Sequence, residues 1–169
     1  MATYSSIRYN MGLSSNTSGG GSLKLISTFT SDGSDATATF ASGIDSTYKE
    51  YLFVFSDIHS QNNGAQFQVG FRDGSTAYDA SKISTFYDAE HNESGSGGGV
   101  AYDTGADLAL STSFQNLTST IGADNDQNCA GFLHLFEPSS TTFVKHFIAS
   151  INDYANSDYI DSNLTAGYF

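Results

Sequence analysis

The residues best suited to chemistry are two histidines, His134 and His146, on either side of a turn at Glu137–Ser140. On consecutive strands they would lie close to register, and facing imidazoles could bind a metal ion or act as an acid–base pair. Both lie among Phe and Leu, however, and no Asp, Glu or Cys stands at ligand spacing. The pattern therefore favours histidines in an apolar setting, and we expect no metal site.

Other reactive side chains have equally ordinary interpretations. His59 follows Asp57 at the end of an apolar run, which favours a strand-end hydrogen bond over part of a catalytic triad. Gly95–Gly99 lacks the Lys-Ser/Thr that follows a phosphate-binding loop. Cys129 is predicted to be a small core residue. No Ser lies in a Gly-x-Ser-x-Gly setting, so we expect no catalytic residue and no cofactor.

Two acidic segments, Asp124–Asp126 and Asp158–Asp161, resemble weak calcium loops. Clustered carboxylates suit hard cations, but neither segment has the spacing or the terminal Glu of a helix–loop–helix calcium site. We interpret both as solvated turns.

Aromatic side chains near predicted loops could stack on sugars. The candidates are Tyr78, Phe86, Tyr87, Tyr102, Tyr154 and Tyr159. Each is also suited to filling one end of a core, and we favour that role over sugar stacking.

The composition indicates an aromatic β-protein. The 169 residues, enough for one domain with a proper core, include 13 Phe, 10 Tyr and 17 Gly, and only 14% are charged. Turn formers are abundant and amphipathic helices are not expected. Because the net charge is −12, the surface should repel phosphate backbones, which disfavours nucleic acid as a partner.

The single Cys excludes an internal disulfide. The first ten residues lack the basic start and apolar stretch of a signal peptide, and no run of 18 apolar residues predicts a membrane span. We therefore expect a protein made in a cytoplasm, with no membrane as partner.

Residues 1–21 are predicted to form an N-terminal arm and linker. Ile7, Tyr9, Met11 and Leu13 alternate with polar residues, and a Ser/Asn/Gly linker follows at 14–21. An alternating segment on such a linker can add to the sheet edge of a partner. These four residues are our candidate docking site; the alternative is that they form the first strand of the body.

The stretch Tyr51–Phe55 is apolar at every position, so we expect a central strand buried on both faces, and Cys129–Phe136 is a second such run. Segments 90–99 and 152–162 are predicted to be loops. Strands are expected at 22–30, 36–40, 48–60, 66–72, 83–87, 129–136, 143–151 and from 164 onwards.

About eight strands with short polar turns predict an all-β fold, an antiparallel β-sandwich of jelly-roll type at residues 22–169, with a barrel as the lesser option. Because the last strand begins close to Phe169, we expect either a body incomplete at its C-terminus or an edge that a neighbouring chain completes.

Three blocks carry a resemblance to a known family: Gly21–Thr30, Ala36–Tyr48 and Glu50–His59. In order they contain Lys-Leu-Ile-Ser, then Gly-Ile-Asp-Ser-Thr-Tyr, then an apolar strand that ends in Ile-His. This pattern resembles small β-rich virion structural proteins of tailed bacteriophages, notably marine cyanophages. The likeness covers residues 21–71 well and the remainder loosely.

The resemblance implies a structural component of the virion exterior with no catalytic residues. Our first hypothesis is a head decoration or cement protein, assembled in the host cytoplasm. Its partners would be the major capsid protein, or a tail or fibre base, and further copies of itself in a homo-oligomer. The alternative is a tail-fibre protein whose sandwich binds host glycan. An enzyme such as a polysaccharide hydrolase would need two nearby carboxylates in a cleft, and the sequence offers no convincing pair.

Overall fold

The computed structural model describes residues 23–169, which divide into two units between Thr39 and Phe40. The described part of the first unit, residues 23–39, contains no helix and no strand. The second unit, residues 40–169, holds every element: β1 Glu50–Ile58, β2 Gln68–Val69, β3 Ile83–Asn92, β4 Gly98–Tyr102, β5 Gln115–Asn116, β6 Cys129–Phe136, β7 His146–Tyr154 and β8 Tyr159–Tyr168. The described chain is all-β, which confirms the predicted class.

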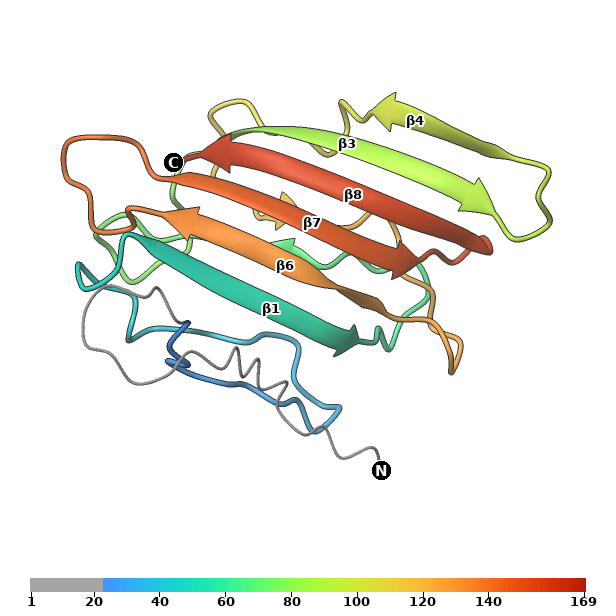
Figure 1. Cartoon of the computed structure of the whole chain (residues 1–169), viewed down its shortest axis with the longest axis horizontal. Helices are drawn as coiled ribbons and strands as arrows, with labels where there is room; N and C mark the ends of the chain where they lie inside the picture. Colours follow the sequence, from blue (N-terminus) through green and yellow to red (C-terminus); the bar gives the residue numbers. More distant parts are fainter. Residues whose placement is uncertain (1–22) are drawn as a thin grey trace, which may run out of the picture. The chain divides into compact units, whose positions relative to one another are not determined.

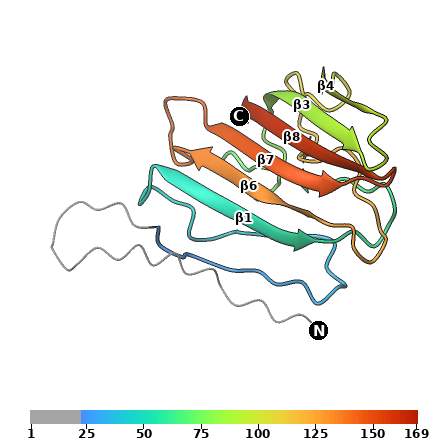
Figure 2. The same cartoon turned by 45° about the vertical axis from the view of Figure 1, so that its right-hand side comes forward.

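Six of the strands form one antiparallel sheet in the order β1-β6-β7-β8-β3-β4 (Figures 1 and 2). β6, β7 and β8 follow one another directly in the chain, and β3 and β4 form a hairpin at one edge. The short strands β2 and β5 pair separately, with Gln68 opposite Asn116. Two antiparallel sheets are consistent with the predicted β-sandwich.

The prediction that Tyr51–Phe55 forms a central strand is wrong. β1 is an edge strand, paired with β6 alone, and Val54 is 66% exposed. Tyr51, Phe53 and Phe55 pack in or against the core, whereas the alternate residues Leu52 and Val54 point to the opposite face of the sheet. The second apolar run is correctly placed inside the sheet, since β6 spans Cys129–Phe136 and lies between β1 and β7. Its expected burial on both faces is wrong, because Phe132 is 41% exposed.

The strands predicted at 22–30 and 36–40 are not formed. Leu25, in the middle of the first, is 73% exposed. Alternation of apolar and polar residues favours a strand only when a neighbouring strand completes its hydrogen bonds. The predicted turn between them does exist: Gly33 has φ +94°, and Ser34 N donates to Asp32 Oδ1 at 2.9 Å.

Two segments predicted as loops are partly strand. β3 continues to Asn92 and β4 begins at Gly98, so the glycine-rich stretch is a tight hairpin with Gly95 at φ +71°. β8 begins at Tyr159, inside the segment 152–162 that was predicted to be a loop. Conversely, of the strand expected at 66–72, only the two residues of β2 are in strand conformation.

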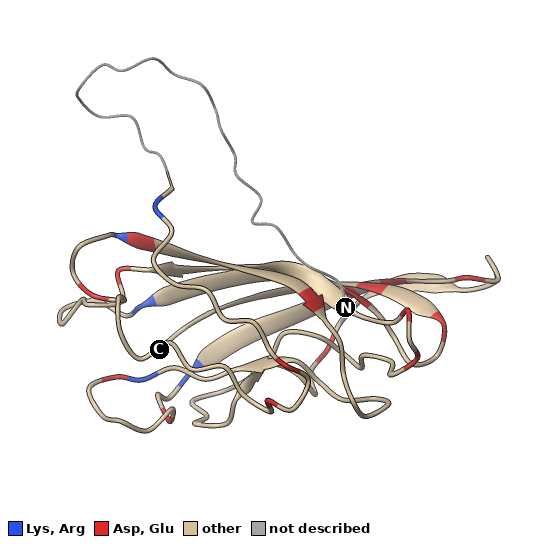
Figure 3. Ribbon diagram, turned by 90° about the horizontal axis from the view of Figure 1, so that it is seen from below, with Lys and Arg blue, Asp and Glu red and all other residues tan. Residues whose placement is uncertain are grey.

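One face of the six-stranded sheet carries the core. Residues of β1, β6 and β7 pack there against side chains from the segments between the strands, among them Phe71, Leu117 and Ile121. Figure 3, which views the sheet edge-on, shows these connecting segments gathered beneath it. The ring of Phe71 contacts two other rings, with centroids 4.9 Å from Phe147 of β7 and 4.4 Å from Phe169, the residue after β8. The predicted aromatic core is therefore present.

Lys82, in one of the segments that connect the strands, is a basic residue with no exposed surface. Its Nζ donates to the carbonyl oxygen of Ala80 at 2.7 Å. Burial lowers the pKa of its ammonium group, and the carboxylates of Asp79 and Asp73 oppose that shift.

The division of the chain into an arm at 1–21 and a body at 22–169 stays a prediction. Within residues 23–169, no helix has the length and apolar character that crossing a membrane requires.

Candidate functional site

The face of the six-stranded sheet opposite the core, which we call the outer face, is not covered by any other described residues of the second unit. Successive side chains of a strand point to opposite faces, so residues that alternate with buried Leu133, Leu135 and Phe147 point outward. Figure 1 looks onto this face, with β2 and β5 behind the sheet. Eight large apolar side chains are exposed on it: Val54, Tyr87, Val100, Tyr102, Phe132, Ile148, Ile160 and Leu164.

Six outward-pointing residues lie in register across all six strands. In sheet order they are Val54, Phe132, Ser150, Leu164, Tyr87 and Tyr102. We call this set the outer row. Apart from Ser150, its members are large apolar or aromatic residues with 41–66% of their surface exposed. Because directly opposed side chains on a sheet contact one another, the outer row is a continuous apolar stripe across the sheet.

The sequence-based interpretation missed this face because it treated both faces of the apolar strands as buried. The signal was nonetheless present. None of the eight strands contains a Lys or Arg. The sequence also predicts no helices, and a large sheet needs a further layer on each face that is to be buried. A contiguous apolar patch of this kind marks an interaction surface more often than a scatter of exposed residues does.

Acidic groups surround the outer face rather than occupy it. Glu50, at the start of β1, is the one acidic residue at an outward strand position, and its carboxylate contacts Nδ1 of His134. At the opposite edge, Asp107 accepts a hydrogen bond of 2.5 Å from the hydroxyl group of Tyr102, which raises the pKa of that hydroxyl. An apolar centre with a polar rim is the usual anatomy of a protein interface.

His134 and His146 both point to the outer face, as expected for consecutive strands, but they are not opposite each other. His134 pairs with Ile148, whereas His146 pairs with Tyr168 on the other side of β7. The ring of His146 packs edge-on against Tyr168, with centroids 5.8 Å apart. Within residues 23–169, no three His, Cys, Asp or Glu side chains are grouped so that they could hold a metal ion.

Of the six aromatic residues considered for sugar stacking, the structure brings two together. Tyr87 and Tyr102 pack edge to face on the outer face, with ring centroids 5.0 Å apart. Phe86 is completely buried and is excluded from that role. The ring of Tyr78 lies under the guanidinium of Arg72, at 4.2 Å.

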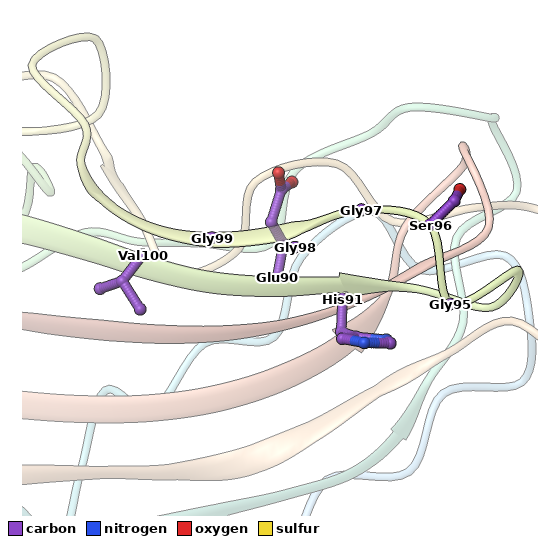
Figure 4. A pocket seen from close by; sticks show the side chains of 8 residues that line it. All are labelled: Glu90, His91, Gly95, Ser96, Gly97, Gly98, Gly99 and Val100. Carbon is purple, nitrogen blue, oxygen red and sulfur yellow. The ribbon is translucent and has the colours of Figure 1, made fainter.

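A hollow of about 580 Å³ lies along the β3–β4 hairpin (Figure 4). Glycines from Gly95 to Gly99 form much of its wall. Figure 4 shows Glu90 pointing to one side of the hairpin, and His91 and Val100 to the other. The carboxylate and the imidazole therefore cannot work together on one substrate atom, and this hollow does not have the arrangement of an acid–base site.

A second hollow of about 330 Å³ lies where β3 and β7 end and β8 begins. It is lined by His91, Asn92, Glu93, Tyr154 and Ile160. The hydroxyl group of Tyr154 donates to Glu93 Oε1 at 2.8 Å, and that hydrogen bond raises the pKa of the hydroxyl to about 12. An aromatic ring beside a carboxylate and an amide is suited to binding a sugar.

On the core face, Asp153 and Asp161 are opposite each other on β7 and β8. Asn163 Nδ2 donates to Asp153 Oδ1 at 2.5 Å, while Asp153 Oδ2 and Asp161 Oδ1 have no hydrogen-bond partner among the described residues. Burial, together with the charge of Asp161, raises the pKa of Asp153 to about 7. Burial and the charges of Glu90 and Asp88 raise that of Asp161 to about 6.

The remaining predicted sites have structural roles. His59 Nδ1 donates to the carbonyl oxygen of Gln127 at 2.6 Å, which confirms the strand-end hydrogen bond. Cys129 is buried, and burial raises the pKa of its thiol to about 12. Asp124 and Asp158 lie in turns: Gln127 N donates to Asp124 O, and Asp158 has φ +62°.

The predicted docking residues Ile7, Tyr9, Met11 and Leu13 lie outside the described residues. Their role stays a prediction. Comparison of the chain with protein-family models, with curated proteins and with solved structures finds no match.

Proposed function

We propose that this chain is a structural protein of a bacteriophage virion, placed on the particle exterior as a head decoration or cement protein. The observation that carries the proposal is the outer row, an apolar stripe that crosses every strand of the sheet in a chain of net charge −12. Such a stripe is suited to binding protein, and a virion subunit works by binding its neighbours. The resemblance of residues 21–71 to virion proteins supports the same role.

In this role the body is a jelly-roll-like sandwich, and the arm residues Ile7–Leu13 attach it to the major capsid protein or to a fibre base. Strand addition at a sheet edge supplies main-chain hydrogen bonds for such an attachment. The acidic surface keeps particles dispersed and excludes the packaged nucleic acid as a partner. No enzyme activity, cofactor or membrane contact belongs to this function.

Electron microscopy of purified phage particles labelled with an antibody against this chain tests the proposal. Label distributed over the head exterior is the expected result. Label confined to the tail or its fibres would support the second candidate below, and particles that carry no label would contradict both.

The second candidate is a tail-fibre protein that binds host glycan. The hollow lined by His91, Glu93 and Tyr154, together with the exposed pair of Tyr87 and Tyr102, is the observation in its favour. A glycan array probed with the purified chain, with and without calcium, separates this candidate from a purely structural role. Replacing Tyr154 with Ala should abolish any glycan signal that the hollow produces.

A further inference from the structure

The outer face has the size of a protein interface. Six strands spaced about 4.8 Å apart and about nine residues long define a surface of roughly 24 Å by 30 Å, on the order of 700 Å². A stable complex of standard size buries about 800 Å² on each partner. The outer face alone therefore comes close to the area that a lasting association needs.

Its lack of charge determines which partner fits. The outer row contains no charged residue, and none of the eight strands contains Lys or Arg. The basic side chains of a positively charged partner could pair with acidic groups at the rim of the outer face, but not at its apolar centre. A second apolar sheet of the same chain, however, leaves no charge unpaired at the centre, since Val54, Phe132 and Leu164 would face residues of the same kind.

We propose that a second copy of this chain packs against the outer face, so that two six-stranded sheets stack face to face in a symmetric dimer. A two-fold interface uses the same patch on both subunits, and two twisted sheets pack at about 10 Å with their strands nearly aligned. The outer row then forms the dry centre of the interface. Ser150, its smallest member, lies between Phe132 and Leu164 and leaves room for a side chain of the other copy.

The inference deepens the assembly role proposed above and relies on it for its purpose, but it is tested on purified protein. Loss of the dimer would leave the virion assignment open, and absence from particles would leave the dimer intact. Failure of one is therefore distinguishable from failure of the other.

The test is sedimentation equilibrium of the full chain over a dilution series. The wild type is expected at twice its 18.0 kDa chain mass. Leu164→Lys in the interior strand β8 and Val54→Lys in the edge strand β1 each place an uncompensated charge in the interface and should weaken dimerisation by roughly 100-fold. Both side chains are about half exposed or more in the single chain, so the monomer should keep its β-type circular dichroism.

Two controls accompany these variants. Phe143→Lys makes a similar change at a side chain that is 77% exposed but outside the sheet, and it should leave the dimer unchanged. Leu164→Met keeps the apolar surface and should do the same. Added salt should tighten the wild-type dimer, because it screens repulsion between two chains of net charge −12.

A wild type that stays monomeric at the highest concentration would overturn the proposal. So would a dimer that persists in both folded Lys variants, or one that is lost when residues 1–21 are deleted while Leu164→Lys leaves it intact. Binding of a glycan or of another protein at this face by a monomeric wild type would assign the face to that occupant.

Discussion

Tyr87 of β3 and Tyr102 of β4 pack edge to face across the hairpin, with ring centroids 5.0 Å apart and planes at 75°. This pair ends the outer row at one edge of the sheet, as Val54 ends it at the other. Each ring leaves more than two fifths of its surface exposed. The contact therefore adds a side-chain link to the backbone pairing of β3 with β4 and leaves aromatic surface exposed for the partner proposed above.

A double-mutant cycle on Tyr87→Ala and Tyr102→Ala measures the first of these roles. Edge-to-face aromatic pairs contribute about 0.5–1.5 kcal/mol beyond area burial, and we expect a coupling free energy in that range. Denaturant unfolding in the Val54→Lys background, which is expected to be monomeric and lies at the far edge of the sheet from both rings, keeps dimerisation out of the measurement. Strictly additive effects would show that the rings do not stabilise the hairpin through each other.

The buried pair of Asp153 and Asp161 predicts that the protein loses stability as the pH rises. Burial raises the pKa of Asp153 to about 7 and that of Asp161 to about 6, above their unfolded value of 3.8. At pH values between the unfolded pKa and the folded pKa, each carboxyl group is protonated to a greater extent in the folded state than in the unfolded state. The free energy of unfolding therefore falls as the pH increases from about 4 to about 7.

Asp153→Asn should remove much of this dependence. The amide keeps an oxygen to accept the hydrogen bond from Asn163, and it carries no charge to bury. We expect it to be more stable than the wild type at about pH 8, by an amount on the order of 2 kcal/mol. Thermal unfolding over a pH series measures this, with the exposed Asp126→Asn as matched control. An unchanged pH profile in Asp153→Asn would refute the assignment.

Gly131 of β6 lies where any side chain would clash. A Cβ atom there would approach the carbonyl oxygen of Ser150 to 2.2 Å and the Cα atom of Ile151 to 2.8 Å. Gly131→Ala should therefore lower the free energy of unfolding by about 2–3 kcal/mol. Gly99→Ala in β4, where a Cβ atom meets nothing within 4 Å, should have little effect. Equal effects of the two substitutions in denaturant unfolding would contradict the tight packing of β6 on β7.

Deleting residues 1–21 tests the docking role of Ile7, Tyr9, Met11 and Leu13. We expect the shortened chain to fold, because β1–β8 all lie beyond the deletion, and to be lost from phage particles. Replacing the same four residues with Ser in the full chain is a milder version of the change. Particles that incorporate either form at the normal level would show that attachment occurs elsewhere.

Short apolar or alternating runs and turn residues predicted the all-β class, and the continuous apolar run at 129–136, which stops at the turn from Glu137, predicted the limits of β6. β8 was predicted too short, because its inward positions include Asp161, Asn163 and Thr165. Buried polar residues hide the apolar periodicity that identifies a strand, and only the structure shows the neighbours that hydrogen-bond to two of them.

The outer face could not have been identified from local pattern alone. In β1, an apolar residue at every position from Tyr51 to Phe55 indicates burial on both sides, whether the second cover comes from the same chain or from another. Which residues align across six strands depends on sheet order, and β1, β6 and β3 are brought together from distant parts of the chain. The pairing that puts Phe132 and Leu164 on either side of Ser150 is a tertiary property.

Hydroxyl-radical footprinting of this chain within purified phage particles tests the account most directly, because it reports on location and on the outer face together. Tyr87, Tyr102 and Phe132 are expected to be oxidised much more slowly in the particle than in the monomeric Leu164→Lys protein, while the exposed Phe143 reacts similarly in both. Rates for the outer-face rings that match those of the monomer, or particles that do not contain the chain, would contradict the account.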